Sequence, residues 1–550
     1  MAAETIFNST VINDNISDTN DRQSQALPLD SAIQNELDDV GFDYIDQVLD
    51  QFNVHYFASQ TSRRNIPAHG RFVLVANYPV SYLDCLALMR FISEVRPDVK
   101  LVSMDLLTSV PQLAKQVIAV GKGSVTTQRR CIAEILNALN QEQGVIVFPA
   151  IKQVGLGKKR KRDKKWHHRF VSLALYSGSP ILPVHIRHRA KRRPVFTATM
   201  PKVMRIEQQL SLDFSVGELI SYEVLKGCPF NVRKRSQLIR RHLYHIAKGR
   251  RGIFATEKSI IHPESPLALR NELQDALLLG ETVDGHKIYL FEYRSESAVM
   301  REIGRLREFT FRYIGEGTGR HKDLDRYDRY YKHLVLWNED KLEIVGSYRM
   351  AVANEVVKQY GLSGLYCQDL FELGEGFQQY LPRALELGRS FVQPKYWGKR
   401  SLDYLWYGIG AYIRHNRQIR YLYGPVSISN SYPELAKNAL VSFYRKYFGA
   451  NPKYAVARRP YNVRSGHIDS VLKRDDYQTG FMRLKEYLGF LDVKVPTLYK
   501  QYTELCEPGG VVFEDFSVDP DFANCIDGLV RVDLALLKQK KRERYIINNS

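Results

Sequence analysis

Charged side chains recur among apolar runs in the second half of the chain, and their spacing points to a polar site inside a fold. In chain order they are Arg307, Asp325 and Asp328, Arg349, and Glu386 and Arg389, and Phe311 follows Arg307 by four residues. An ionised group is costly to bury unless it is paired, so residues of this kind in an apolar setting mark a candidate for binding or catalysis. We therefore expect the chemistry of the protein to lie here.

The elements that must position these residues can be inferred from the pattern of apolar runs. With 550 residues, the chain is long enough for two or three domains, and 44% hydrophobic, 25% charged and 11% aromatic residues are typical of a globular protein. In the first half, runs such as RFVLVANYP, GVIVFPA and SPILPVHI alternate with helical patterns such as CIAEILNALNQE. This alternation predicts an α/β fold.

The second half predicts another α/β domain of a different kind. Strand patterns occur at KIYLFEYRS, HLVLW, EIVGSYRM, LELGRSFVQ and YLYGPVSIS, with helices over about 297–313, LDYLWYGIGAYIRH and ELAKNALVSFYRKYF, and a turn into a strand at PGGVVFEDFSVDP. We expect two mixed-sheet domains, a first domain at 31–258 and a second at 284–540, joined by a linker at 259–283. A flexible polar tail (1–30) precedes them, and a basic, polar tail (541–550) follows.

The order of elements in the second domain resembles the GNAT acyltransferase fold. Four parts of the sequence resemble the branch that takes acyl chains from acyl carrier protein: Arg307 with Phe311, the Asp325 and Asp328 pair, Arg349, and Glu386 with Arg389 in ELGRS. This branch comprises the amino-acid lipid N-acyltransferases and, more distantly, the acyl-homoserine lactone synthases. GEGTG, HLVLW and GPVSISNSYP resemble the ornithine lipid synthase type, in which this domain follows a second acyltransferase-like domain. The resemblance implies an enzyme that transfers a 3-hydroxyacyl chain from acyl carrier protein to the amine of ornithine or a similar amino acid.

The resemblance also implies roles for the residues. Amide formation from a thioester needs a neutral amine, so we take Glu386 as the general base, with Arg389 pairing nearby to hold its geometry. Backbone oxyanion donors are expected near 390–393, and Tyr444 is expected to stabilise the departing thiolate. The residues assigned to substrate binding are Arg307, Phe311, Asp325, Asp328 and Arg349. The alternative is that Glu386 and Arg389 form only a structural ion pair and that Asp325 and Asp328 cap a turn.

A second group is expected to receive the acyl carrier protein and its phosphopantetheine arm. It consists of Lys395, Lys399, Arg400 and Ser401, which precede or begin a helix whose N-terminus can bind a phosphate. A glycine-rich pyrophosphate loop is absent from the sequence, which favours a carrier-protein donor over coenzyme A. We expect no bound cofactor and no metal, with the acyl-carrier thioester as co-substrate.

The first domain resembles the glycerolipid O-acyltransferases through ANYPVSYLD, VFPA and PVHI, but its motifs are degenerate. Tyr78 stands where the family carries a histidine base, although Ser81 and Asp84 follow in the same motif, and Lys152 stands where a glutamate is common. A tyrosine is a poor base at neutral pH, so we expect weak or no O-acyl transfer. The alternative is a fully bifunctional synthase whose first domain O-acylates the lyso-lipid.

The charge balance predicts an anionic partner. A net charge of +19 and the run KKRKRDKK at 158–165, followed by Trp166, favour an anionic membrane surface and an acidic carrier protein. A solvated loop fits the run as well, and a non-enzymatic protein that binds membrane or nucleic acid is a further alternative, although we do not expect nucleic acid. The sequence lacks a membrane-spanning run, so we expect a cytoplasmic protein, peripheral on the inner face of the membrane.

Overall fold

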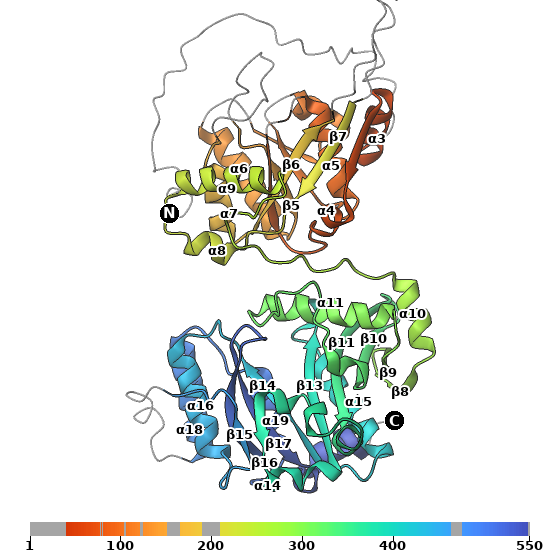
Figure 1. Ribbon diagram of the computed structural model, residues 1–550, viewed down its shortest axis with the longest axis vertical. Helices are drawn as coiled ribbons and strands as arrows, with labels where there is room; N and C mark the ends of the chain where they lie inside the picture. The colour runs from red at the N-terminus through yellow and green to blue at the C-terminus, as the bar shows by residue number, and fades with distance from the viewer. Residues whose placement is uncertain are drawn as a thin grey trace, which may run out of the picture. The chain divides into compact units, whose positions relative to one another are not determined.

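The structure, a computed structural model, describes residues 40–77, 79, 81–103, 106–120, 125–150, 166–189, 210–463 and 476–547. The chain divides into two compact units, Met1–Ser259 and Ile260–Ser550, each with its own sheet (Figure 1). Four features expected from the sequence lie outside the described residues: the polar tail at 1–30, Tyr78, Lys152 and the basic run at 158–165.

Unit 1 is built on a seven-stranded mixed sheet in the order β1-β7-β6-β2-β5-β3-β4. Its strands are β1 (Val54–Ala58), β2 (Phe72–Ala76), β3 (Lys100–Ser103), β4 (Val117–Ala119), β5 (Gly144–Val147), β6 (Ile181–His188) and β7 (Leu210–Val216). The central strands β2, β5 and β6 are parallel, and β6 pairs antiparallel with β7. This unit confirms the α/β pattern predicted from RFVLVANYP, GVIVFPA and SPILPVHI.

Helices cover both faces of this sheet. They are α3 (Phe42–Gln51), α4 (Gln60–Arg64), α5 (Tyr82–Ser93), α6 (Val125–Asn140), α7 (Arg169–Ser177), α8 (Tyr222–Gly227) and α9 (Val232–Ile246). Alternate residues of β2 face opposite sides: Phe72 and Leu74 pack with α3 and α5, whereas Val73 and Val75 pack with α6, α7 and α9. The result is a three-layer α/β/α unit with two apolar cores.

Unit 2 has an eight-stranded mixed sheet in the order β16-β17-β14-β13-β11-β10-β9-β8, and a small sheet of β12 and β15. The strands are β8 (Leu277–Glu281), β9 (His286–Glu292), β10 (Lys332–Asn338), β11 (Glu343–Val352), β12 (Phe371–Leu373), β13 (Ala384–Val392), β14 (Tyr421–Ile428), β15 (Ala455–Ala457), β16 (Val511–Asp519) and β17 (Cys525–Asp533). Every strand predicted in this half is present.

The helices of unit 2 pack on opposite faces of the large sheet. They are α10 (Pro266–Gln274), α11 (Ala298–Tyr313), α12 (Ala353–Tyr360), α13 (Cys367–Leu370), α14 (Glu375–Gln378), α15 (Ser401–His415), α16 (Glu434–Phe448), α18 (Tyr477–Phe490), α19 (Thr497–Thr503) and α20 (Gln539–Arg542). The α10 and α11 helices share a core with Val335 and Trp337 of β10, whereas α15 shares another with Leu334 and Leu336.

Two segments expected to be irregular are instead part of unit 2. The predicted linker at 259–283 contains α10 and β8, because Leu269 and Leu273 bury one helix face and β8 pairs with β9. The predicted tail at 541–550 continues α20 as a helical turn over Glu543–Ile547. There Tyr545 is buried, and its hydroxyl donates to Asp403 Oδ1 at 2.8 Å.

The strands β13 and β14 run parallel but separate after three residue pairs, which join 384–386 to 421–423. On its other edge, the ladder of β13 with β11 passes from Gly388 directly to Phe391, so Arg389 and Ser390 form a bulge. Arg389 has a φ of 48°, in the left-handed region. A bulge bends a strand and redirects its side chains, and this one lies where the two strands part.

Candidate active site

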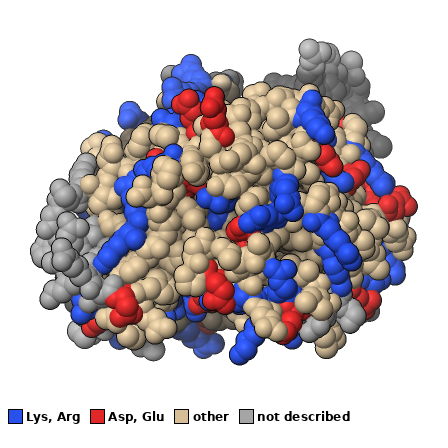
Figure 2. Space-filling view, turned by 90° about the horizontal axis from the view of Figure 1, so that it is seen from below, with Lys and Arg blue, Asp and Glu red and all other residues tan. Residues whose placement is uncertain are grey.

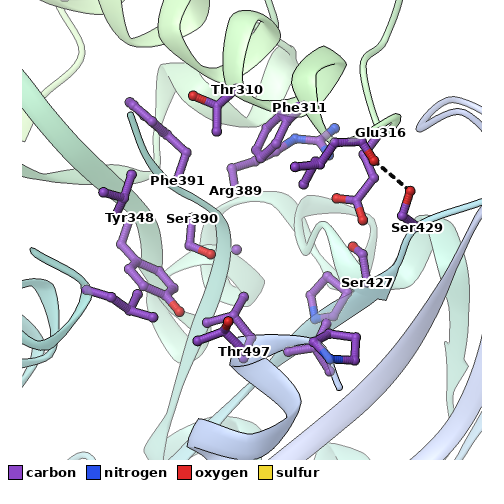
Figure 3. Close-up of a pocket in the computed structure, with 18 of the residues that line it drawn as sticks. Thr310, Phe311, Glu316, Tyr348, Arg389, Ser390, Phe391, Ser427, Ser429 and Thr497 are labelled. Atoms are coloured by element: carbon purple, nitrogen blue, oxygen red, sulfur yellow. Dashed lines mark hydrogen bonds between the residues drawn. The ribbon is translucent and has the colours of Figure 1, made fainter. Parts of the chain in front are cut away.

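A cavity of about 890 Å³ opens between the separated ends of β13 and β14. One wall comes from 387–392 of β13 and another from 425–429 around the end of β14 (Figure 3). Further lining comes from α11, the segment before α15, the start of α19, Tyr348 of β11 and Asp527 of β17. Most of the lining is apolar or aromatic, with a few polar side chains among it. A cavity of this size and lining is suited to an acyl chain and a small polar acceptor.

Two carboxylates line this cavity, and neither was assigned a role from the sequence. Burial, with a smaller contribution from the nearby charge of Asp527, raises the pKa of Glu316 to about 8. Burial raises the pKa of Asp527 to about 7, with a contribution from Asp519. In Figure 3 the Glu316 side chain reaches into the cavity above Ser427. A carboxylate with a pKa near the working pH is suited to general-base catalysis.

Neighbouring elements hold the two carboxylates differently. Asp527 lies on β17 opposite Ser427 of β14, whose hydroxyl donates to Asp527 Oδ1 at 2.7 Å. Glu316 follows α11 in the turn at 315–319, and its backbone N–H donates to the Phe311 carbonyl at 2.7 Å. No hydrogen bond to the Glu316 carboxylate is found within the described parts of the chain. Glu316 is therefore the better placed of the two to accept a proton from a ligand.

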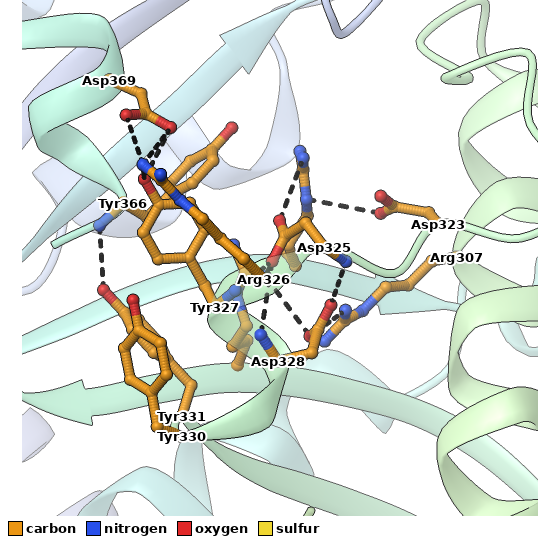
Figure 4. A network of polar contacts seen from close by, with 12 residues as sticks. Arg307, Asp323, Asp325, Arg326, Tyr327, Asp328, Tyr330, Tyr331, Tyr366 and Asp369 are labelled. Carbon is orange, nitrogen blue, oxygen red and sulfur yellow. Dashed lines mark hydrogen bonds and ion pairs between the residues drawn. The ribbon is translucent and has the colours of Figure 1, made fainter. Parts of the chain in front are cut away.

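The charged residues predicted from the sequence form a buried network beside the cavity (Figure 4). Arg307 Nη1 donates to Asp328 Oδ1 at 2.7 Å, and Arg349 Nη1 donates to Asp325 Oδ1 at 2.6 Å. Arg349 Nη1 also lies 3.3 Å from Asp328 Oδ1. Burial alone would raise the pKa of Asp328, but Arg307 and Arg349 bring it far below its ordinary value. The charged residues singled out from the sequence therefore lie together as a buried ion-pair cluster.

Arg389 is the member of this network that reaches the cavity. Its Nε lies 3.4 Å from Asp323 Oδ2 and its Nη2 lies 3.7 Å from Asp325 Oδ2, while its guanidinium stacks 5.0 Å from the Tyr366 ring. The expected pairing of Arg389 with Glu386 is therefore wrong, because the bulge turns Arg389 toward the aspartates. Of the expected substrate-binding residues only Phe311 lines the cavity; Arg307, Asp325, Asp328 and Arg349 lie behind it.

Glu386 is fully buried and does not line the cavity. Its Oε2 accepts a hydrogen bond from the Tyr331 hydroxyl at 2.5 Å and its Oε1 accepts one from the Cys367 backbone N–H at 2.7 Å. The Tyr331 hydroxyl in turn accepts from the Tyr366 N–H at 2.9 Å. Glu386 thus fixes the segment that carries Tyr366, and its position favours a positioning role over that of the base.

Tyr444 lies in the apolar core instead of the cavity. It is fully buried on α16, with its ring 4.7 Å from that of Tyr499 and 5.3 Å from that of Phe513. Burial raises the pKa of Tyr444, and its hydroxyl has no hydrogen-bond partner among the described residues. This placement disfavours Tyr444 as the group that stabilises a departing thiolate.

The residues expected to receive the carrier arm are divided by the structure. Lys399 lines the cavity together with Trp397 and Gly398, at the segment before α15. Lys395 is ion-paired with Glu343, Arg400 Nη2 donates to the Tyr407 hydroxyl at 3.2 Å, and Ser401 is buried as the first residue of α15. Only Lys399 is therefore placed to contact a ligand inside the cavity.

In unit 1, the two described residues of the degenerate motif lie together. Asp84 is fully buried in the first turn of α5 and accepts a hydrogen bond from the Ser81 hydroxyl at 3.2 Å. Its other oxygen, Oδ2, lies 2.8 Å from His188 Nε2. Throughout the described ranges there is no cluster of three or more possible metal ligands, and none of the helices has the length and apolar character of a membrane span.

Comparisons with known proteins agree with this geometry. A family model described as an acetyltransferase (GNAT) domain matches residues 306–407. A glycine N(alpha)-acyltransferase of Phocaeicola vulgatus is 33% identical over 263 residues, which is 45% of this chain and 81% of that protein. The chain is also similar to two L-ornithine N(alpha)-acyltransferases. The one from Rhizobium meliloti is 32% identical over 26% of this chain and 49% of that protein. The one from Brucella abortus is 28% identical over 37% of this chain and 73% of that protein. The residues matched by the domain model include Glu316 and Arg389.

Proposed function

This chain belongs to the family of amino-acid N(α)-acyltransferases with a GNAT domain, and we propose that it transfers a 3-hydroxyacyl chain from acyl carrier protein to the α-amine of ornithine or a similar amino acid. The enzyme class follows from the family. The donor, the acceptor and a role in aminolipid synthesis are the proposal, supported by the cavity and its charges. Relatives that act on glycine and on ornithine differ in their acceptor, so the amino acid itself is decided by experiment.

Glu316 is the base in this mechanism. The amine of the acceptor is protonated near neutral pH and must lose a proton before it can attack. The neutral nitrogen then attacks the thioester carbonyl carbon, the C–N bond forms, and the C–S bond breaks as the tetrahedral intermediate collapses. The proton that Glu316 accepts from the ammonium group is passed to the departing thiolate, and the second proton that the nitrogen loses on becoming an amide is released to water. The products are therefore an amide, a free thiol on the carrier arm and one proton.

The β13 bulge is proposed to stabilise the tetrahedral intermediate. Arg389 and Ser390 stand outside the ladder with β11, and β14 has already parted from β13 at this point. Backbone N–H groups freed from strand pairing in this way are suited to bind an oxyanion. Arg389 also brings a guanidinium to the same wall, held in place by Asp323 and Asp325.

The entrance beside α15 is proposed to hold the phosphopantetheine arm. Trp397, Gly398 and Lys399 line the cavity immediately before the first turn of that helix. The N-terminus of a helix attracts phosphate through its free N–H groups and its dipole, and Lys399 adds a positive charge. This arrangement suits the single phosphate of a carrier arm.

The proposed partners follow from the charge of the protein. A net charge of +19 favours both an acidic carrier protein and an anionic membrane surface. Figure 2 shows one face on which lysine and arginine side chains are spread among acidic ones. We propose a cytoplasmic enzyme that is peripheral on the inner membrane face, where it would deliver its lipid product.

The observation that carries the proposal is a buried carboxylate of raised pKa in a cavity of acyl-chain size, in a family whose members acylate amino-acid amines. The test uses the purified full chain with 3-hydroxypalmitoyl-acyl carrier protein or the matching coenzyme A thioester. Ornithine, glycine and N(α)-acetylornithine, whose α-amine is blocked, are offered as acceptors, and mass spectrometry identifies the amide.

We expect an N(α)-acyl product from the carrier thioester with ornithine or glycine, a slower reaction with coenzyme A, and no product from the blocked acceptor. Acylation of N(α)-acetylornithine would show that the side-chain amine reacts and would contradict the proposed acceptor group. Faster transfer from coenzyme A than from the carrier protein would contradict the proposed donor.

A further inference from the structure

The bulge in β13 lets the cavity of unit 2 reach both faces of the large sheet. Leu387 packs in the apolar core that includes α15 and α16, whereas Phe391, four residues later, packs in the core that includes α11. Side chains four residues apart on a regular strand face the same side, so the bulge reverses the alternation. Both residues line the cavity, which therefore opens toward both cores.

The two ends of the cavity differ in polarity. Phe311 lines one end and belongs to the core of α11; Glu316 follows that helix, and Asp527 lies on β17 two residues from Cys525 of the same core. This end holds both carboxylates and suits a polar acceptor. The lining at the other end is mostly apolar, suits an acyl chain, and comes from the core that includes α15 and α19: Leu387, Leu402, Val426, Leu498 and Tyr502.

Tyr348 places a hydroxyl group at the apolar end. It lies on β11 opposite the bulge, because the ladder with β13 passes directly from Ser347 to Arg349. Neighbouring residues of a strand face opposite sides, so Arg349 enters the ion-pair network while Tyr348 enters the other core. The Tyr348 side chain is 1% exposed yet lines the cavity, and Figure 3 shows it below the bulge, away from Glu316.

The Tyr348 hydroxyl is a buried polar group without a hydrogen-bond partner among the described residues. Burial raises the pKa of Tyr348, against the lowering effects of the Ser390 and Tyr502 side chains, so the group stays a neutral hydroxyl that can donate and accept. An unpaired buried hydroxyl is unfavourable, so a ligand group that pairs with it is favoured. Thr310 Oγ1 is also buried and unpaired, but it lies on α11, at the end that holds the carboxylates.

We propose that Tyr348 selects donors that carry a hydroxyl group on the third carbon of the acyl chain, by forming a hydrogen bond with that group. This inference deepens the proposed function and rests on it. The bulge is proposed to bind the reacting carbonyl, and the 3-hydroxyl is only two carbons further along the chain. Tyr348 stands opposite the bulge on the neighbouring strand, about 5 Å away in the sheet, so its side chain can meet this group while the chain continues into the apolar end.

The test compares donors that differ only at the third carbon. The purified full chain receives (R)-3-hydroxypalmitoyl-, (S)-3-hydroxypalmitoyl- or palmitoyl-acyl carrier protein, with ornithine and glycine supplied together as acceptors, and kcat/KM is measured for each donor. Tyr348→Phe removes the hydroxyl and keeps the ring. Tyr444→Phe is the matched control, because its hydroxyl is also buried and without a partner among the described residues but does not line the cavity.

We expect the unmodified protein to prefer one 3-hydroxypalmitoyl donor over palmitoyl by about 10-fold to 100-fold in kcat/KM, because palmitoyl leaves the Tyr348 hydroxyl unpaired. A single hydroxyl on one wall should also distinguish the two enantiomers. Tyr348→Phe should reduce both preferences to within about threefold, whereas Tyr444→Phe should keep them.

The outcomes separate this inference from the proposed function. Amide formation in which the preference for the 3-hydroxy donor persists in Tyr348→Phe would overturn the role of Tyr348 and leave the proposed function standing. Equal use of palmitoyl and both 3-hydroxy donors by the unmodified protein would do the same. Absence of amide from every donor would overturn both.

Discussion

Replacing Asp527 by asparagine is expected to shift the pH dependence of amide formation to lower pH without abolishing it. The pKa of Glu316 lies near 8 because the side chain is buried and because Asp527 is a like charge close by. The substitution removes that charge but leaves the burial unchanged, so the pKa of Glu316 should fall yet stay above the ordinary value for glutamate.

The size of the effect can be worked out from the titration. With a pKa of about 8, roughly a tenth of Glu316 is ionised at pH 7, whereas a pKa lowered to about 7 would leave about half ionised. If ionised Glu316 is the base, the rate at pH 7 should rise about fivefold in Asp527→Asn. The plateau above pH 9 should change little, because Glu316 is ionised there in both proteins.

The assay follows thiol release and amide formation from about pH 5.5 to 9.5, at a fixed concentration of the same amino acid. The titration of the acceptor amine contributes equally to both profiles, and Glu375→Gln, at an exposed position on α14, is the matched control for a removed carboxylate. An unshifted acidic limb would refute the coupling of the two carboxylates. Loss of activity at every pH would identify Asp527 itself as the base and refute the role of Glu316.

Three further predictions concern the buried charges and the core. Arg349→Met leaves Asp325 and Asp328 without their shared partner and should lower the free energy of unfolding, measured in urea titrations, by about 3 to 5 kcal/mol. Arg349→Lys, which keeps the positive charge, should lose less. An unchanged free energy of unfolding in Arg349→Met would contradict the stabilising role of the network. Tyr444→Phe should keep the amide-forming rate within about twofold, because the Tyr444 hydroxyl contacts neither the cavity nor a hydrogen-bond partner among the described residues. A large loss of rate would show that the hydroxyl takes part in the reaction. Between about pH 4.5 and 8, Glu316 holds a proton in the folded protein but not in the unfolded chain, so its contribution to the free energy of unfolding falls as pH rises through that window. The free energy of unfolding of Glu316→Gln, measured relative to that of the unmodified protein, should therefore rise by about 4 kcal/mol between pH 5 and 9. A difference between the two proteins that stays constant with pH would contradict the raised pKa.

Much of the fold was predictable because local patterns agreed with the final structure. Alternating or continuous apolar runs marked β2, β5, β6, β10, β11, β13 and β14, and the amphipathic spacing of 297–313 marked α11. The buried network was also predictable, because charged residues such as Arg307 and Arg349 lie within apolar stretches of sequence that are typical of a protein interior. Buried charges are costly unless they are paired, so the residue types alone predicted a cluster of charged side chains.

The two carboxylates that face the cavity, and the partners of two other buried groups, could not be identified from local sequence. Asp527 lies in an ordinary strand pattern, and only the pairing of β17 with β14 brings it to Ser427. Glu316 stood inside the GEGTG phrase, but its raised pKa depends on burial that no local pattern reports. His188 meets Asp84 across 104 residues of sequence. Glu386 was misjudged for the same reason, because its neighbours come from 331 and 367.

The most direct test of the account compares Glu316→Gln with Glu386→Gln in single-turnover amide formation at pH 8. If Glu316 is the base and Glu386 only positions the segment at 366–367, the first variant should lose about 100-fold to 10,000-fold in rate, which corresponds to about 3 to 5 kcal/mol of barrier, and the second about tenfold at most. A Glu316→Gln enzyme that keeps its rate while Glu386→Gln loses it would contradict the central claim.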